Sequence, residues 1–327
     1  MARIFFIIIA GLFALAPVSP LSAQLSVGTF STMTISIFPE HPGPNQSVTA
    51  TFNGFSVDLD GARIQWFHNG RSAANGTGLK TYTFTTRGAG TEETLRAVAT
   101  APNGKQREAS FSFRIGDVDL VWRADTSAPP WYSGKHLASP RSRVIVSAVP
   151  HLISGGREIP ASQLIYQWSE NGRFEQALSG AGKQTFAFRT GEANTIKHEI
   201  TVEISNTSKS VVIEKSVTVP IQNPFVLFYE EHPLEGPRGR ALSSVRPFAM
   251  ARGDDKEFRA ASFFFSGQAP LDYQWTINGA ETEKAAPASV LRLKSGGFLG
   301  RAAIQTKITN LANIFQKAEA LFYVDVQ

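Results

Sequence analysis

Histidine residues are the first candidates for acid–base or metal chemistry in this chain. The triplet Glu-His-Pro occurs twice, at 40–42 and 231–233, and a repeated triplet could mark a repeated metal or acid–base site. Each copy supplies a single histidine, however, whereas zinc requires a complete tetrahedral set of ligands. We therefore expect His41 and His232 to be turn residues in the same loop of two homologous domains.

Paired aspartates offer oxygen ligands at two other places. Asp58 and Asp60 flank a leucine, and Asp254 and Asp255 are adjacent. Calcium takes about six to eight oxygen ligands, so two carboxylates in one short loop favour a turn. The chain also has no cysteine, which excludes disulfides and thiolate metal sites. Because no nucleophile-elbow, phosphate-loop or zinc-protease motif is present, we expect no catalytic residue, metal or cofactor.

The stretch SAPPWYSGKHLASPRSR, at 127–143, is the best candidate for a binding loop. Trp131 and Tyr132 follow two prolines that stiffen the backbone, and Lys135 and His136 lie close by. Aromatic rings on a loop can stack on sugar rings or on a peptide. The alternative is that Trp131 and Tyr132 cover the end of a domain or pack against a neighbouring domain.

A repeated pattern indicates which elements position these residues. QWFHNG, QWSENG and QWTING begin at residues 65, 167 and 274. Alternate residues around each tryptophan share one face, which is the period of a β-strand. The Asn-Gly that follows tolerates positive φ at both positions, as a type I′ turn requires. We expect three strands, each with a buried tryptophan and a two-residue turn, formed by Trp66, Trp168 and Trp275 and by Asn69, Gly70, Asn171, Gly172, Asn278 and Gly279.

A second landmark keeps the same spacing in each copy. Two alternating strands around a polar turn follow every tryptophan, and these turns begin at Pro102, Asn206 and Asn310. The tryptophans precede them by 36, 38 and 35 residues, and successive tryptophans are 102 and 107 residues apart. About seven short strands in about 100 residues predict an all-β chain of tandem immunoglobulin-like sandwiches.

The motifs also carry a resemblance to known proteins. Tyr-x-Trp-x-x-Asn-Gly at 166–172 and 273–279 resembles the immunoglobulin-like and PKD-like modules of exported bacterial proteins. The motif order, which includes DLVWRADTSAPPWYSGK and VLFYEEHPLEGP, is similar to that of an uncharacterised family of signal-bearing bacterial proteins. The chain departs from the PKD signature, because no Asp-Phe-Gly-Asp follows the tryptophans, and from antibody-type domains, because cysteines are absent. The resemblance covers nearly the whole chain and implies surface or scaffold roles without enzymatic activity.

The N-terminus predicts export. Arg3 precedes the apolar run 4–16, and small residues end the segment, which is the layout of a secretory signal peptide, 1–23, cleaved after Ala23. The run is shorter than the ~20 residues that span a bilayer, although an uncleaved anchor is the alternative. We divide the remainder into three immunoglobulin-like domains, at 24–117, 118–222 and 223–327. The linkers between them are short, which favours an elongated rod over a compact packing of the domains.

Charge and composition exclude other classes of protein. The chain carries 32 Lys and Arg against 27 Asp and Glu, spread without a basic run, so we expect no nucleic-acid partner. The leading hypothesis is a non-catalytic exported spacer or adhesion-type protein whose partner is a protein or glycan at the cell envelope. A carbohydrate-binding protein that uses Trp131 and Tyr132 is the second hypothesis. A pilus-like filament subunit that exchanges strands is the third, although all three copies have a complete set of strands.

Overall fold

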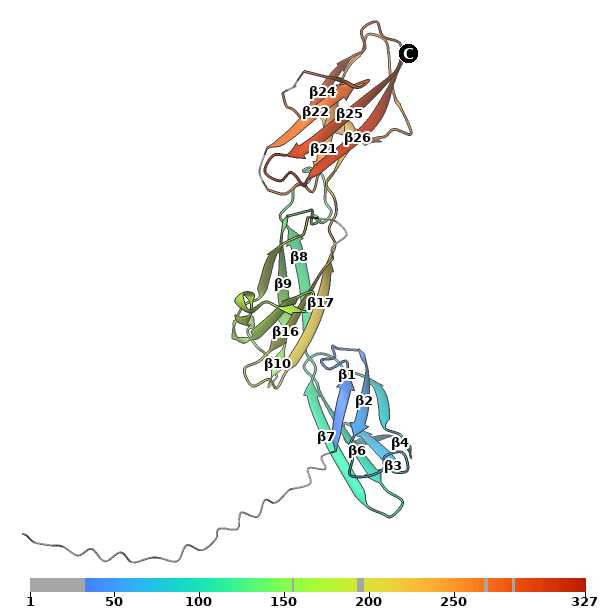
Figure 1. The fold of residues 1–327 in the computed structure, drawn as a ribbon, viewed down its shortest axis with the longest axis vertical. Coiled ribbons are helices and arrows are strands. Elements are labelled where there is room, and N and C mark those ends of the chain that lie inside the picture. The colour runs from blue at the N-terminus through green and yellow to red at the C-terminus, as the bar shows by residue number, and fades with distance from the viewer. Residues whose placement is uncertain (1–32, 155, 193–196, 268–269, 284–285) are drawn as a thin grey trace, which may run out of the picture.

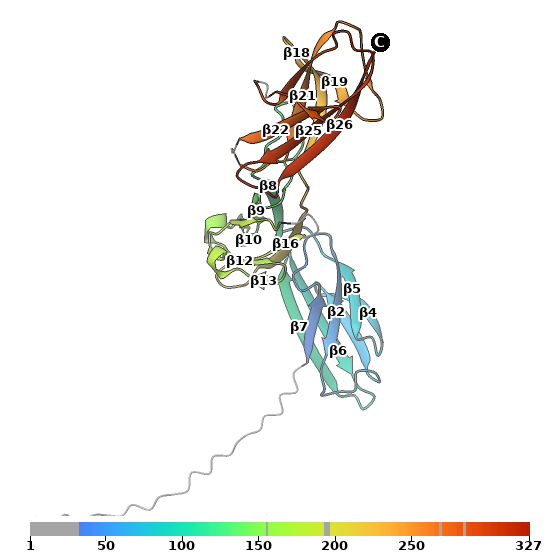
Figure 2. The same ribbon diagram turned by 45° about the horizontal axis from the view of Figure 1, so that its top comes forward.

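A computed structural model describes residues 33–327, except 155, 193–196, 268–269 and 284–285. Three β-sandwiches follow one another along the longest axis of the molecule (Figure 1). A second view shows the same end-to-end order (Figure 2). The arrangement is thus elongated, as the short linkers suggested. The expected signal peptide and its cleavage site after Ala23 lie outside the described residues.

The first sandwich packs a three-stranded sheet on a four-stranded sheet, and neighbouring strands are antiparallel. Alternate residues of the second strand, Val48, Ala50 and Phe52, point into the core. The first sheet holds, in spatial order, β1 (Thr34–Phe38), β2 (Ser47–Asn53) and β5 (Thr81–Thr85). The second holds β4 (Arg71–Thr77), β3 (Arg63–His68), β6 (Glu92–Thr100) and β7 (Gln106–Arg114).

The second sandwich repeats this plan with short additions. Its first sheet holds β15 (Thr185–Arg189), β9 (Arg143–His151) and β8 (Asp117–Ala124). Its second holds β13 (Arg173–Phe174), β12 (Ile165–Glu170), β16 (His198–Ser205) and β17 (Val212–Val219), with β14 (Gly180–Ala181) also pairing β12. The additions are a two-stranded hairpin and two 3-10 turns: β10 (Ile153–Ser154), β11 (Arg157–Glu158), η1 (Ala161–Gln163) and η2 (Gln176–Leu178).

The third sandwich has two further strands. Its first sheet holds β19 (Gly236–Leu242), β18 (Phe225–His232), β21 (Asp255–Phe263) and β24 (Val290–Lys294). Its second holds β20 (Phe248–Met250), β26 (Lys317–Val326), β25 (Gly300–Asn310), β22 (Leu271–Ile277) and β23 (Ala280–Glu281). β20 runs parallel to β26, whereas the other paired strands of this sandwich are antiparallel.

One strand order is common to the three sandwiches. The first, second and fifth strands of the repeat form one sheet, and the third, sixth and seventh form the other. Each sandwich encloses its own cluster of buried apolar side chains. Side chains that alternate inward from two facing sheets build such a core. The chain is therefore an all-β protein of tandem immunoglobulin-like sandwiches.

The three repeated tryptophans occupy equivalent places in these cores. Trp66, Trp168 and Trp275 lie on β3, β12 and β22 and are 0%, 0% and 4% exposed. A buried indole N–H needs an acceptor. In each sandwich the indole N–H donates to the backbone carbonyl two residues before the fifth strand. The N···O distances are 2.9, 2.8 and 2.9 Å, to Leu79, Lys183 and Ala288. The tryptophan therefore ties the third strand to the start of the fifth across the core.

The Asn-Gly turns are two-residue hairpin connections. The φ angle is 49–51° at the three asparagines and 77–83° at the three glycines, which are type I′ values. The asparagine side chain has a second role, because its Oδ1 accepts a backbone N–H of the sixth strand. These bonds measure 2.9, 2.9 and 2.8 Å and come from Thr94, Glu199 and Ala303. Asparagine thus extends the sheet into the turn, which glycine could not do.

A buried hydroxyl fixes the loop between the first and second strands. Thr86, Thr190 and Ser295 directly follow the fifth strand of their sandwiches. Their Oγ atoms donate to loop carbonyls at 2.7, 2.6 and 3.0 Å, in Gly43, Ser139 and Ala251. In the first two sandwiches this loop faces the next sandwich along the chain. The hydroxyl therefore positions the residues from which the junctions are built.

Candidate functional site

The junction between the second and third sandwiches gathers the most distinctive features of the sequence. The loop 125–142, between β8 and β9, reaches from the second sandwich to the third (Figure 1). It contains the stretch with Trp131 and Tyr132. Three kinds of contact cross this junction: aromatic packing, a buried network of polar side chains, and backbone hydrogen bonds.

The two loop aromatics pack on the third sandwich. The Tyr132 ring meets Phe263 and Phe264 edge-on, with centroids 5.6 and 5.8 Å apart. Trp131 meets Tyr229 edge-on at 6.0 Å and remains 46% exposed. Such edge-to-face pairs stabilise beyond their buried area. The loop therefore serves as an interdomain contact, the alternative that its sequence had left open.

Lys135 and His136 point back to their own sandwich. The Lys135 ammonium lies 3.3 Å from the centroid of the Trp122 ring, and burial lowers the pKa of this amine. His136 Nδ1 donates to the Thr126 carbonyl at 2.6 Å. The four candidate binding residues thus divide between two sandwiches, two facing each. Their use in binding a ligand stays a prediction.

Gln316 forms the centre of a buried polar network at this junction. It is fully buried, and its Nε2 donates to Ser139 Oγ at 2.7 Å and to the Pro140 carbonyl at 2.9 Å. Its Oε1 accepts from Ser266 N at 2.8 Å and from Asn310 Nδ2 at 2.9 Å. Loss of one partner in a buried network leaves several groups unsatisfied. This side chain therefore couples the two sandwiches in one geometry.

A backbone link and a strained phenylalanine reinforce the network. Ser127 N donates to the Phe265 carbonyl at 2.8 Å, and Phe264 N donates to the Ser127 carbonyl at 2.6 Å. Phe264 has φ of 63°, a region that bulky residues rarely adopt. Its ring is buried beside Phe225, with centroids 5.5 Å apart. Packing on both sides thus holds the backbone in a conformation that it would otherwise leave.

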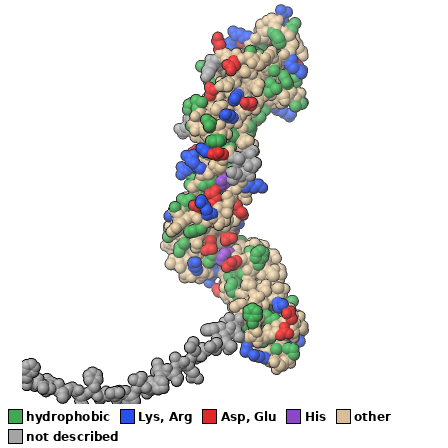
Figure 3. All heavy atoms as spheres, viewed as in Figure 1, with side chains coloured by type: hydrophobic (Ala, Val, Ile, Leu, Met, Phe, Trp, Pro, Cys, Tyr) green, Lys and Arg blue, Asp and Glu red, His purple; other side chains and the backbone are tan. Residues whose placement is uncertain are grey.

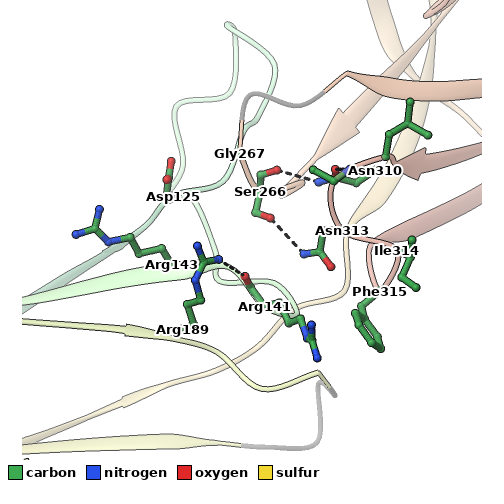
Figure 4. Close-up of a pocket in the computed structure, with 12 residues that line it drawn as sticks. Asp125, Arg141, Arg143, Arg189, Ser266, Gly267, Asn310, Asn313, Ile314 and Phe315 are labelled. Carbon is green, nitrogen blue, oxygen red and sulfur yellow. Dashed lines mark hydrogen bonds between the residues drawn. The ribbon is translucent and has the colours of Figure 1, made fainter.

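An open groove of about 730 Å³ lies beside this junction (Figure 4). Arg143 and Arg189 enter it from strands of the second sandwich, and Ile314 and Phe315 line it from the β25–β26 loop of the third. The Arg141 guanidinium covers the Phe315 ring, with its carbon 4.4 Å from the centroid. The groove therefore has a predominantly cationic wall from the second sandwich, with three arginines and the carboxylate of Asp125, and an apolar wall from the third.

The repeated Glu-His-Pro triplets have different surroundings. His41 lines a second groove, of about 800 Å³, between the first and second sandwiches, and its Nε2 lies 4.0 Å from a Glu203 oxygen. His232 ends β18, and its Nδ1 accepts the Leu234 N–H at 3.3 Å. Both are therefore local or junction residues. No group of three or more possible metal ligands occurs in the part of the chain that the structure describes.

The paired aspartates make local contacts. Asp58 Oδ1 accepts the Asp60 N–H at 3.1 Å, and Asp254 Oδ2 accepts the Ala251 N–H at 2.9 Å. Asp255 forms a two-pronged pair with Arg292, at 2.9 and 2.6 Å. A carboxylate that accepts a nearby backbone N–H stabilises a turn. Each aspartate pair is thus accounted for by turn and strand-pair chemistry.

A buried His–Glu pair escaped the sequence reasoning. Glu93, on β6, is fully buried and accepts from His68 Nε2 at 2.9 Å. Burial raises the pKa of this carboxyl, but hydrogen bonds from Arg87, Asn69 and His68 outweigh it and hold the pKa at about 2. The second sandwich exchanges the two residue types, with Glu170 on the third strand and His198 on the sixth, 2.6 Å apart. Aligning the first two repeats at their Asn-Gly turns would place His68 opposite Glu170 and could have revealed this exchange.

Comparisons with known proteins find fold likeness at most. No protein-family model matches the chain, and no curated protein does. The three N-terminal domains of the highly immunogenic outer capsid protein of bacteriophage RB49 are 12% identical, with a TM-score of 0.25, over 91% of this chain and 99% of that one. The fibronectin(III)-like modules of Clostridium thermocellum CbhA are 12% identical, with a TM-score of 0.27, over 58% and 94%. A bacterial ice-binding adhesin is 10% identical, with a TM-score of 0.22, over 91% and 98%.

These similarities are too low to assign a function, and the fold class rests on the sheets themselves. Within residues 33–327, apart from the short undescribed segments, no helix has the length and apolar character needed to cross a membrane.

Proposed function

We propose that the chain is a non-catalytic exported scaffold that holds a partner away from its point of attachment at or outside the cell envelope. Its second and third sandwiches act as one rigid body, and the first is joined to them more loosely. The buried network around Gln316 carries this proposal, because a spacer transmits position through fixed junctions. The signal-like N-terminus supports export.

The first junction supports a looser attachment. Among the described residues, no hydrogen bond joins the first sandwich to the second. His41 approaches Glu203 at 4.0 Å, and both side chains are partly exposed. An exposed pair at this distance contributes little to stability. Ile153 also lies against Gly90 across this junction, but an apolar contact without hydrogen bonds does not fix one geometry. Relative motion is the default for domains unless their interface is large and hydrophobic.

The strand-exchanging filament gains no support from the fold. In each sandwich the first and last strands of the repeat are both paired within the same unit. A subunit that accepts a donated strand leaves a gap in its sheet. We therefore favour the scaffold over the filament.

Spin-label distances test the proposal. Because the chain has no cysteine, single cysteines can be introduced at exposed Lys105, Arg157 and Lys317, one in each sandwich. We expect a narrow distance distribution for the pair Arg157→Cys and Lys317→Cys, and a broad one for the pair Lys105→Cys and Arg157→Cys. Distributions of equal width would contradict the two-part scaffold.

A further inference from the structure

We propose that the groove beside the second junction binds an acidic peptide segment with an apolar side chain, presented by a partner protein. The inference names the partner of the scaffold and so rests on the proposed function. It needs no enzyme activity and concerns Arg143, Arg189 and Ile314, which the junction network does not use.

Two arginines face each other across neighbouring strands in the cationic wall. Arg143 on β9 and Arg189 on β15 are direct cross-strand partners, so their side chains leave the same face of the sheet. Like charges directly opposite each other destabilise a strand pair. On β8 the residue opposite Arg143 is Asp125, whose backbone N–H donates to the Arg143 carbonyl at 2.8 Å, and Arg123 lies two residues before it. Arg143 also lines two smaller hollows of about 210 and 390 Å³. Three arginines and one aspartate thus share this exposed face, which leaves it an excess of positive charge for a ligand.

The guanidinium groups of this pair are available to a ligand. In the described part of the chain, no carboxylate lies within ion-pair distance of Arg143 or Arg189. Arg189 donates to the Arg141 carbonyl at 3.3 Å, and Arg141 is paired with Glu192. Arginine pairs readily with carboxylates in two-pronged geometry. A carboxylate-bearing partner therefore supplies the charge that the pair lacks.

The opposite wall explains why we favour a peptide. Leu311 and Ile314 are 61% and 66% exposed on the β25–β26 loop, and Phe315 lies beside them. Exposed apolar side chains next to a cationic wall match an acidic segment with an apolar anchor. An anionic glycan would use the arginines but leave the apolar wall unused. The groove volume also lies in the range of ~300–1,000 Å³ typical of ligand clefts.

Peptide titration tests the inference. The probe is the fluorescein-labelled heptapeptide EFEGEFE, whose anisotropy is followed as the exported chain is added at low salt. We expect one saturable site that the double variant R143E/R189E weakens by more than about tenfold. The control R157E/R246E, which makes the same charge change at exposed arginines elsewhere, should leave the affinity unchanged. Equal weakening in both variants would show non-specific attraction and overturn the site.

Two further arms separate a peptide from an anionic glycan. EGEGEGE, which lacks the aromatic anchor, should bind more weakly than EFEGEFE, and Ile314→Ser should remove that difference. The peptide assignment would be overturned if EFEGEFE does not bind while a sulfated polysaccharide binds the wild type and Ile314→Ser equally well. If no probe binds but the spin-label distances are as expected, the binding role of the groove is refuted and the proposed scaffold function still stands.

A single charge reversal separates a binding role from a structural one. Arg189→Glu turns the repulsive pair into an attractive one, so we expect a higher Tm together with weaker peptide binding. Arg189→Gln is the neutral comparison and should give intermediate values of both. A lower Tm in Arg189→Glu would show that the arginine pair stabilises the fold, and would overturn its assignment to a ligand.

Discussion

The two junctions of this molecule arise from the same repeat but differ in what crosses them. At each, the loop after the first strand of one sandwich faces the next sandwich. That loop spans residues 39–46 in the first sandwich and 125–142 in the second, so the second is longer by ten residues. The added length carries Trp131 and Tyr132 onto the third sandwich.

The opposing loops, 206–211 and 311–316, also differ, and one of their positions decides what crosses the junction. The carbonyl of Val211 accepts the N–H of Asn206 in the second sandwich, and the carbonyl of Gln316 accepts that of Asn310 in the third. These two positions are therefore equivalent in the repeat. Valine buries an apolar side chain, whereas glutamine reaches across the junction. The repeat thus secures each core, while positions outside its shared pattern decide how neighbouring cores are joined.

Gln316→Val should make the second junction resemble the first, and it has the largest expected effect. It leaves the Ser139, Ser266 and Asn310 groups without their partner, which should cost about 3 kcal/mol. Denaturant unfolding should show this loss, and the spin-label distribution across the junction should broaden. Gln305→Val, on an exposed position of β25, is the control. An unchanged distribution would show that the aromatic contacts suffice.

Acid should distinguish the first sandwich from the third. The folded pKa of Glu93 is about 2, below its ordinary value of 4.5, so its stabilisation is complete above about pH 4.5 and is lost as the pH falls toward 2. This contribution is on the order of 2–3 kcal/mol. Calorimetry should show that Glu93→Gln flattens the pH dependence of the first sandwich in this window. A wild-type first sandwich that is equally stable at pH 2.5 and 5 would contradict this.

Truncation of aromatic residues should also separate the junctions. Tyr132→Ala removes ring contacts with Phe263 and Phe264 and should reduce the stability of the coupled pair by about 2 kcal/mol. Phe38→Ala, beside the first junction, removes a ring that is 80% exposed and should change stability by less than about 0.5 kcal/mol. Equal losses in thermal unfolding would remove the distinction.

The smallest effect is expected at the charge pair of the first junction. His41→Ala removes a partner 4.0 Å from Glu203, and both groups are accessible to solvent. We expect a change below about 0.5 kcal/mol. Scattering profiles of the variant and the wild type should coincide within error at moderate salt. A marked increase in flexibility would mean that this junction is also held by specific contacts.

Local patterns in the sequence predicted the strands and cores well, because alternation and Asn-Gly turns are local signals. They also predicted that the loop with Trp131 could pack against a neighbour. They did not reveal the roles of Gln316 or Ser139, because local sequence does not distinguish a polar loop residue buried at a junction from one exposed to solvent. Phe264 was likewise hidden, because FFF reads as a strand and its positive φ is imposed by tertiary contacts.

The parallel strand β20 gives the third sandwich a longer parallel pairing than the second, where Ala138 and Ile221 form a single parallel bridge. If the molecule is stretched between its ends, tension leaves this unit through β26, whose last residues pair with β20 at three positions, Phe248, Ala249 and Met250. Strands drawn lengthwise past one another must break such bonds together, whereas a hairpin that is peeled open loses them in turn. We expect the third sandwich to yield at a higher force than the first two in single-molecule pulling, so it should stay folded after they have opened.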